Sequence, residues 1–313
     1  MPPSSNPARL IRLLASGILT LATLLSLPAC ANEPGGTTTT TPPPVGNYRS
    51  GNAAFDEIIN NGPVADAALI EAFPWTATLR QTGVLRVGSD GTSPLFWDVA
   101  DATGFERGLA LLLARYLLGN AVIEVVPVTP NTAADALATG AADVVISQYA
   151  ITPERLERLR FSGPYYLAGS TMVSRSATVG AQHPTRVAVV ANSVQATLLP
   201  ATSEALPLPT HAQCVAALLA GDADAYLADE SLAIAAWAAN PEFNLGPRLP
   251  APTDAYGIAF PRSAATASVK LLFDNWLAGL MADGTWAALW QLTLGQAGGE
   301  APLPPVLNSA GNA

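Results

Sequence analysis

From Val84 onward the sequence alternates short apolar segments with longer amphipathic ones, and this order constrains the fold more than any other feature. Short apolar runs favour buried strands, and apolar residues that recur every three or four positions favour helices. The alternation is typical of an α/β fold with a mainly parallel sheet. The first elements that we expect are, in order, strand 84–88, helix 106–118, strand 122–126, helix 132–139 and strand 144–146.

An extended segment, residues 165–174, interrupts this order, and a second alternation begins at Val187. Its expected elements are strand 187–190, helix 212–219, strand 225–228, helix 231–239, strand 256–260, and helices 267–281 and 285–292. The last two helices carry Trp276, Trp286 and Trp290, which we expect in the core because aromatic residues at helical spacing usually pack. The repeated alternation indicates a second lobe.

Composition excludes one class of partner. The chain has 313 residues, half of them hydrophobic, so it can bury substantial cores. Its net charge is −9 and it has a single lysine, Lys270. Because phosphate neutralisation needs clustered basic residues, we do not expect binding to nucleic acid.

The amino terminus has the composition of an export signal. Arg9 and Arg12 precede an apolar run, residues 13–27, which is shorter than the roughly 20 residues that a membrane-spanning helix needs. We therefore expect residues 1–29 to be a signal peptide and the mature protein to be extracytoplasmic, on the periplasmic or outer face of the cell membrane.

Residues 27–30 resemble the bacterial lipoprotein cleavage box, in which the cysteine, here Cys30, becomes the lipid-modified first residue. This resemblance implies anchoring to the membrane through a lipid, although Pro28 departs from the usual residue. The alternative is an ordinary secretory signal that leaves Cys30 without a role. The only other cysteine, Cys214, lies in an apolar helical pattern and is expected in the core. With only His183 and His211 besides, we expect no metal and no cofactor.

Three further segments flank the alternating region. Residues 30–46 are rich in threonine and proline and should form a flexible tether. Residues 47–82 have apolar residues at near-helical spacing, which predicts an N-terminal helical extension of one or two helices. Residues 296–313 form a C-terminal tail.

One arginine lies near the start of a predicted helix. Thr152 is a suitable N-cap, and Pro153 suits the first helical position. Such a helix start favours an anion, and the planar fork of Arg155 can bind a carboxylate through two hydrogen bonds of about 1.5 to 3 kcal/mol each. The alternative is that Arg155 forms a weak ion pair with Glu154 or Glu157 on an exposed face.

A set of motifs resembles a known family, and they occur in the family's order. They are residues 85–90, Pro94 with Phe96, residues 104–106, Gly140 with Asp143, residues 151–155, residues 161–166 and residues 283–286. From Gly83 to Gly295 the chain resembles the family 3 extracellular solute-binding proteins of amino-acid ABC importers. The resemblance is greatest to actinobacterial lipoproteins that bind glutamate, aspartate or glutamine.

The resemblance implies a two-lobed α/β fold of the type II periplasmic-binding-protein kind, with mainly parallel sheets joined by two hinge strands. Lobe 1 would comprise residues 83–168 plus 257–295, and lobe 2 residues 169–256. The family binds a small solute between the lobes and delivers it to an ABC importer permease. We expect a monomer with a small-molecule ligand, and not an enzyme.

The resemblance also implies a set of ligand-binding residues. Arg155 matches the arginine that binds the ligand carboxylate. Asp229 matches the aspartate that binds the ammonium, although it could simply cap the following helix. Phe96 and Trp97 match the aromatic wall over the ligand side chain, although either ring could belong to the core. The remaining expected ligand-binding residues are Asp90, Ser147, Gln148, Tyr149, Ala150, Ser193 and Val194.

Two positions depart from the family pattern. Ala150 replaces a serine or threonine, and Val194 stands where the family has a hydroxyl that meets the carboxylate. If each lost hydrogen bond is worth about 1 kcal/mol, the affinity falls roughly thirtyfold for the pair. The ligand identity is therefore open.

Two other functions are compatible with this scaffold. Periplasmic cyclohexadienyl dehydratases resemble these binding proteins, and Asp90 and Asp229 would be the candidate acids. A sensory module that reports ligand occupancy to a membrane partner is the other alternative. No set of nucleophile, base and orienting residue is visible in the sequence.

Overall fold

The computed structural model describes residues 47–93, 95–97, 102–175, 186–199, 201–247, 249, 254–297 and 304–307. The chain divides into two compact units, Met1–Pro44 and Val45–Ala313, and every described residue belongs to the second unit.

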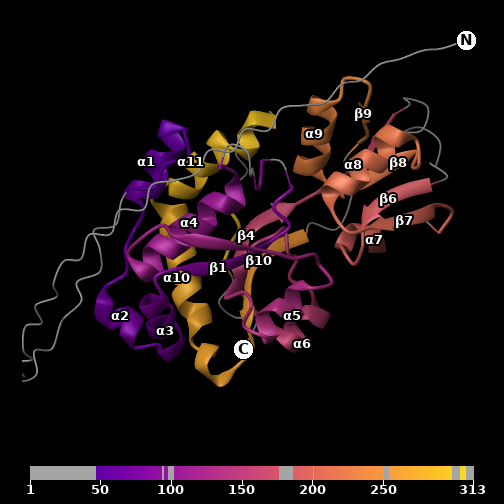
Figure 1. Cartoon of the computed structure of the whole chain (residues 1–313). Helices are drawn as coiled ribbons and strands as arrows, with labels where there is room; N and C mark the ends of the chain where they lie inside the picture. Colours follow the sequence, from indigo (N-terminus) through magenta and orange to yellow (C-terminus); the bar gives the residue numbers. More distant parts are fainter. Residues whose placement is uncertain are drawn as a thin grey trace, which may run out of the picture. The chain divides into compact units, whose positions relative to one another are not determined.

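The first sheet has five strands in the order β2-β1-β3-β10-β4. Figure 1 labels three of them, β1, β4 and β10. The strands are β1 Leu85–Ser89, β2 Ile123–Pro127, β3 Val144–Val145, β4 Leu159–Ala168 and β10 Asp254–Pro261. β1 pairs in parallel with β2 and β3, whereas β10 is antiparallel to both β3 and β4. The carboxyl ends of β1 and β3 therefore lie at the same edge.

The second sheet repeats this arrangement in the order β7-β6-β8-β5-β9. Its strands are β5 Ser170–Ser174, β6 Arg186–Val190, β7 Glu204–Leu208, β8 Ala225–Asp229 and β9 Asn244–Leu245. β6 is parallel to β7 and β8, and β5 is antiparallel to β8 and β9. Each sheet is mixed, because one strand next to a crossing between the sheets, β10 in the first and β5 in the second, runs against the other four.

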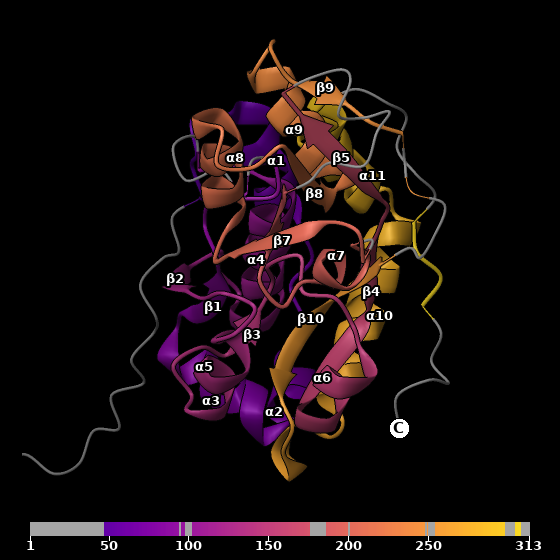
Figure 2. The ribbon, with the colours of Figure 1, turned by 90° about the vertical axis from the view of Figure 1, so that its right-hand side faces the viewer.

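The helices that accompany the strands have the following bounds: α1 Ala53–Asn61, α2 Ala67–Glu71, α3 Pro74–Thr82, α4 Phe105–Leu118, α5 Ala133–Ala138, α6 Pro153–Arg158, α7 Val194–Thr197, α8 His211–Ala220, α9 Glu230–Ala239, α10 Val269–Ala282 and α11 Thr285–Leu292. We call the first sheet with α1 to α6, α10 and α11 lobe 1, and the second sheet with α7 to α9 lobe 2. The chain crosses between the sheets after Ala168 and again between Leu245 and Asp254. Figure 2 shows β5, β7 and β8 on one side of the molecule and β1, β3 and β10 on the other.

Local sequence explains where several helices begin and end. Thr152 accepts a hydrogen bond from the Arg155 backbone N–H at 3.3 Å, and Pro153 is the first residue of α6, as predicted. Gly119 ends α4 and Gly221 ends α8 in the left-handed conformation that glycine adopts without strain.

The core of lobe 1 includes α4, whose leucines are buried on nearly every face. Trp276, Trp286 and Trp290 of the last two helices are buried in the same cluster, which confirms the expectation from their spacing. The Trp286 indole N–H also donates to the Tyr165 carbonyl at 2.8 Å, so α11 is bonded to β4 as well as packed.

The N-terminal extension contains three helices, not the one or two expected. Asp66 caps α2, and Pro74 stands at the first position of α3, so each starts a new helix. Phe55, Ile59 and Ile70 are fully buried in the core cluster of lobe 1. The extension is therefore part of the packed domain.

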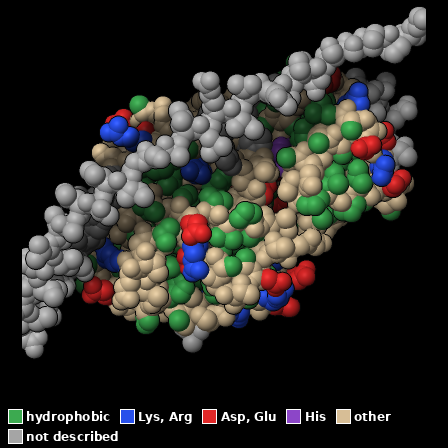
Figure 3. All heavy atoms as spheres, viewed as in Figure 1, with side chains coloured by type: hydrophobic (Ala, Val, Ile, Leu, Met, Phe, Trp, Pro, Cys, Tyr) green, Lys and Arg blue, Asp and Glu red, His purple; other side chains and the backbone are tan. Residues whose placement is uncertain are grey.

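The surface carries few charges. On the face in Figure 3, uncharged side chains cover most of the visible area, and charged side chains occur in small separate groups. None of the helices in the described part of the chain combines the length and the apolarity that a bilayer span requires.

Candidate functional site

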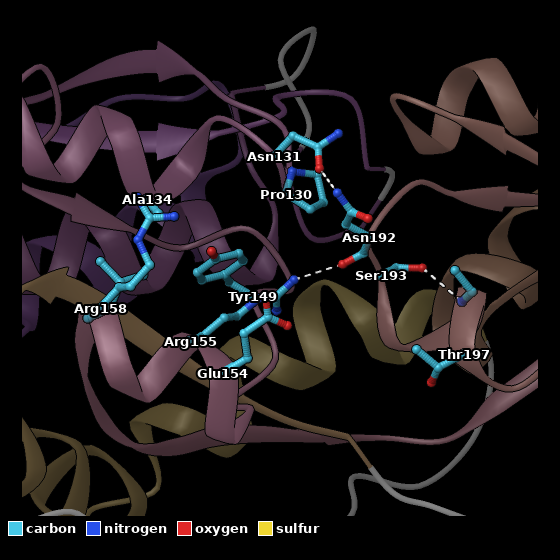
Figure 4. Close-up of a pocket in the computed structure, with 12 residues that line it drawn as sticks. Pro130, Asn131, Ala134, Tyr149, Glu154, Arg155, Arg158, Asn192, Ser193 and Thr197 are labelled. Atoms are coloured by element: carbon cyan, nitrogen blue, oxygen red, sulfur yellow. Dashed lines mark hydrogen bonds between the residues drawn. The ribbon is translucent and has the colours of Figure 1, made fainter.

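Arg155 turns its guanidinium into the protein. Nη1 donates to the Ala150 carbonyl at 2.8 Å, and Nη2 donates to the Asn192 carbonyl at 3.0 Å. The guanidinium carbon lies 3.9 Å from the centre of the Tyr149 ring, which is stacked in turn on Phe161. Because Asn192 follows β6, one arginine bonds to both lobes (Figure 4).

The surface ion pair expected as the alternative for Arg155 does not form: within the described residues Arg155 makes no ion pair with Glu154 or Glu157. Burial lowers the pKa of Arg155, and nearby groups such as Tyr149 and Glu154 partly offset this shift. A cation that is partly desolvated and bonded only to neutral carbonyls is suited to an anionic ligand.

A cavity of about 390 Å³, which we call the outer cavity, lies beside Arg155. Figure 4 shows residues from both lobes around it. Lobe 1 contributes Asn131, Tyr149 and Arg158, and lobe 2 contributes Asn192 and Ser193. The Asn192 side-chain amide also donates to the Asn131 side chain, which is a second bond between the lobes.

A second cavity of about 60 Å³, the inner cavity, is lined by five of the predicted residues: Asp90, Ser147, Gln148, Ser193 and Asp229. Asp90 follows β1, and Ser147 and Gln148 follow β3, so the parallel strands of lobe 1 bring them to one edge. Asp229 ends β8 of lobe 2 and reaches the same cavity from the opposite side. The two cavities share Ser193 and Pro130 as lining residues.

Asp229 caps a helix, as the alternative expected, and also lines the inner cavity. Its carboxylate caps α9 by accepting the Ser231 and Leu232 N–H groups at 2.7 and 3.4 Å. It also accepts the Tyr256 hydroxyl at 2.9 Å and lines the inner cavity. Burial raises its pKa to about 7, and these hydrogen bonds oppose the shift.

Asp90 is held in a chain of hydrogen bonds. Its backbone N–H donates to the Ser147 hydroxyl at 3.1 Å. The Ser93 oxygen lies 2.9 Å from Asp90 Oδ2 and 2.8 Å from Gln148 Oε1. The Ser93 hydroxyl donates to one of these two oxygens. Burial raises the pKa of Asp90, and the hydrogen bonds from Thr92 and Ser93 oppose this shift.

Phe96 and Trp97 require a correction. We expected these rings to form the apolar wall over the ligand, but they are 0% and 1% exposed and line neither cavity. Phe96 packs edge-on against Phe105 and Tyr166 instead. The backbone turn explains this placement, because the Phe96 carbonyl accepts the Glu106 N–H at 2.9 Å and holds the segment against α4.

The other predicted residues take different positions. Tyr149 faces the outer cavity, and Ala150 is buried with its carbonyl bonded to Arg155. Ser193 caps α7 through its hydroxyl, which accepts the Ala196 N–H at 3.3 Å. Val194 packs against the core cluster and lines neither cavity.

Glu106 is a buried acid that we did not select as a site residue. Its carboxylate accepts the Gln148 backbone N–H at 2.6 Å, the Gln148 side-chain amide at 2.7 Å, and the Tyr165 hydroxyl. Burial raises its pKa to about 7. Gln148 has a φ of 43°, which is strained for a residue other than glycine, so Glu106 stabilises the loop that carries Ser147 and Gln148.

Two more polar residues near the inner cavity, Asp254 and His211, were missed. Asp254, at the crossing from lobe 2 back to lobe 1, accepts the Gln195 amide at 2.9 Å, and burial raises its pKa to about 6. Gln195 lines the cavity with His211, whose ring lies against Tyr226. The burial of His211 could have been inferred from the sequence, because it shares a helix face with Cys214 and Leu218, which are fully buried.

Some predicted features lie outside the described residues. These are the signal peptide 1–29, the lipidation site Cys30, the tether 30–46, Pro94, His183, and residues 298–303 and 308–313 of the C-terminal tail. Within the described residues, no group of three or more histidine, cysteine, aspartate or glutamate side chains is placed to hold a metal ion.

Comparison with solved structures shows the fold. A mutant of ArgBP from T. maritima is 25% identical with a TM-score of 0.61, covering 70% of this chain and 98% of that chain. The cysteine-binding protein from Campylobacter jejuni is 20% identical with a TM-score of 0.65, covering 72% and 95%. The ancestral amino acid-binding protein AncCDT-1 is 26% identical with a TM-score of 0.60, covering 70% and 99%.

The likeness to these proteins shows that the two mixed sheets form the type II periplasmic-binding-protein fold. A family comparison matches residues 85–295, more than half of the chain, to the bacterial extracellular solute-binding proteins, family 3. The chain therefore belongs to the family 3 bacterial extracellular solute-binding proteins.

Proposed function

We propose that this protein captures an amino acid between its lobes and delivers it to an ABC importer. The observation that carries the proposal is the pairing of Arg155 on lobe 1 with Asp229 on lobe 2 around two adjoining cavities. A zwitterion has a carboxylate that can bind Arg155 and an ammonium that can bind Asp229. Binding would therefore bridge the lobes and favour their closure.

Arg155 can exchange its partners without leaving its position. Two of its five N–H groups now bond to the Ala150 and Asn192 carbonyls, which are neutral acceptors. A ligand carboxylate would be a stronger acceptor for the same fork. The guanidinium lies over the face of the Tyr149 ring, which fixes its position. Replacing a carbonyl by a ligand carboxylate therefore needs little movement of the side chain.

The location and the delivery step complete the proposal. The family is extracellular, which supports an extracytoplasmic site of action. We propose that Cys30 carries a lipid, that residues 30–46 tether the domain to the membrane, and that the monomeric closed form docks on a permease. A Cys30→Ala variant that stays in the membrane fraction would contradict the anchor.

The proposed binding is tested by calorimetric titration of the purified protein with the common amino acids. Arg155→Ala should weaken binding about a hundredfold or more, because two hydrogen bonds to a charged group are lost. Arg155→Lys should recover part of the affinity, since it keeps the charge and loses the fork. Arg186→Ala, at the opposite end of β6 from the cavities, is the control and should bind normally. Failure of every amino acid to bind the wild-type protein would refute the proposal.

A catalytic function is the second candidate, because the carboxyl group of Asp229 titrates near neutral pH inside a cavity. AncCDT-1 is described as a precursor of cyclohexadienyl dehydratase, which gives a substrate to test. We favour binding, because capping and the Tyr256 bond already fix the Asp229 carboxylate. Turnover of prephenate by the purified protein, lost in Asp229→Asn, would establish the catalytic alternative instead.

A further inference from the structure

The inner cavity offers more hydrogen-bond acceptors than donors. Asp90 and Asp229 line it from opposite lobes. Gln195 uses its amide nitrogen to bond to Asp254 and Ser170, and its amide oxygen has no partner among the described residues. No lysine or arginine is among the residues that line this cavity. A ligand that satisfies these oxygens must bring hydrogen-bond donors, N–H or O–H groups.

His211 lies in the wall of the same cavity. It is the first residue of α8 and is 3% exposed. Its Nδ1 lies 3.0 Å from the Tyr226 hydroxyl, and the two ring centres are 5.4 Å apart, so packing and a hydrogen bond fix the orientation of the imidazole. Nε2 has no partner in the described part of the chain. It is therefore the ring atom available to a ligand.

The imidazole contributes no positive charge to the cavity. Burial lowers the pKa of His211 to about 4, and its place at a helix N-terminus also disfavours protonation. Nδ1 and the Tyr226 hydroxyl share one hydrogen bond, whose direction depends on the tautomer of the ring. In the tautomer whose Nδ1–H donates to the Tyr226 oxygen, Nε2 is one more acceptor and receives a cationic or amide group without repulsion. A carboxylate would instead meet Asp90 and Asp229 with no cation to balance it.

The charged groups of a whole amino acid can be paired with the charged residues of both cavities. The α-carboxylate of an amino acid would meet Arg155, and its α-ammonium would meet Asp229. Asp90 then remains without a partner of opposite charge among the residues that line the inner cavity. Because the two cavities share Pro130 and Ser193, a ligand held at Arg155 can extend its side chain toward Asp90 and His211.

We infer that the ligand is an amino acid whose side chain ends in an N–H donor, an amide, ammonium or guanidinium group, and that His211 is the residue that selects this end. The inference rests on the proposed function and restricts the class of amino acid that the protein binds. It favours glutamine over glutamate and aspartate, and it extends the candidates to the basic amino acids.

The experiment is calorimetric titration with arginine, lysine, glutamine, glutamate and alanine. The wild-type protein should bind at least one nitrogen-ended ligand about tenfold or more tightly than glutamate. His211→Phe keeps the ring that packs on Tyr226 and removes both nitrogens. It should weaken binding of the preferred ligand about tenfold and change the affinity for alanine less than about twofold. His211→Asn, which restores a polar side chain, should recover part of the loss for the preferred ligand.

The controls separate a binding effect from a folding effect. Ala216→Gln lies on the exposed side of α8 and should leave all affinities unchanged. If His211→Phe does not fold, Asp90→Asn provides the second variant. It should reduce the ratio between the affinity for the preferred ligand and the affinity for glutamate. Tightest binding of glutamate, or an equal loss for all ligands in His211→Phe, would overturn the inference while leaving amino-acid binding intact. Binding of no amino acid at all would instead refute the proposed function and the inference together.

Discussion

Glu106→Gln tests whether the buried acid behind the ligand loop holds a proton in the folded protein. Glu106 is fully buried and accepts three hydrogen bonds, two of them from Gln148. Burial raises its pKa from 4.5 to about 7, and the nearby Asp90 charge adds to the shift. Glutamine has nearly the same shape but does not ionise, so the substitution removes the titration and keeps the packing.

The sign of the pH effect follows from the direction of this pKa shift. Because the folded state binds the proton more tightly than the unfolded state, Glu106 contributes its full stabilisation below pH 4.5 and loses it as the pH rises through about 7. A difference of one pKa unit corresponds to about 1.4 kcal/mol, so the loss is on the order of 3 kcal/mol. The free energy of unfolding of Glu106→Gln should not show this pH-dependent loss.

Urea unfolding of both proteins between pH 4 and pH 8 measures the effect. The difference in the free energy of unfolding, variant minus wild type, should increase by about 2 to 4 kcal/mol across this range. The buried acids Asp229 and Asp254 titrate in both proteins, so their contributions cancel in the difference. Glu157→Gln, at an exposed position, serves as the control. A difference that is constant with pH would show that Glu106 is ionised at acid pH and that the argument from burial is wrong.

Three further predictions concern the fold and the site. Ile59→Ala should lower the free energy of unfolding by about 2 to 5 kcal/mol in urea titration, because Ile59 is fully buried in the core of lobe 1; a loss below about 1 kcal/mol would mean that the extension is not part of that core. Gly104→Ala should lower the melting temperature, because Gly104 has a φ of 121° and an added Cβ would lie 2.5 Å from the Phe96 carbonyl oxygen; an unchanged melting temperature would contradict this geometry. Tyr256→Phe should weaken ligand binding more at pH 7 than at pH 9. In the wild-type protein the hydrogen bond from Tyr256 lowers the pKa of Asp229, so its loss favours the protonated carboxyl group at pH 7. Equal weakening at both pH values in calorimetry would count against the ionised role of Asp229.

The order of strands and helices could be predicted because it depends on local patterns. Strand β8 and helix α11 lie within one residue of their predicted bounds, and the capping of α6 by Thr152 is as expected. The third helix of the extension was missed because Asp66 and Pro74 interrupt an apolar period that otherwise continues. The antiparallel strand β10 was expected as a strand, but its direction depends on where the chain returns from lobe 2, which no local pattern records.

The buried polar residues of the site were only partly predictable. Glu106 lies on the same helix face as Leu109 and Leu113, which are fully buried, and a charged residue on such a face is a signal that it has a buried partner. Asp254 gave no such signal. Its burial and its bond to Gln195 depend on how the two lobes meet.

The strength of ligand binding depends on this meeting of the lobes more than on any single residue. Two of the five N–H groups of Arg155 are bonded to the Ala150 and Asn192 carbonyls, so a ligand carboxylate either uses the remaining N–H groups or displaces these bonds. Each bond between the carboxylate and the guanidinium is worth about 1.5 to 3 kcal/mol, and the net gain is smaller by the energy of any bond that is displaced. Removing Arg155 also breaks the bond to lobe 2, so the free protein should close less readily. The affinity lost in Arg155→Ala will therefore exceed the net gain from the carboxylate alone, and only measurement of both binding and closure can separate the two contributions.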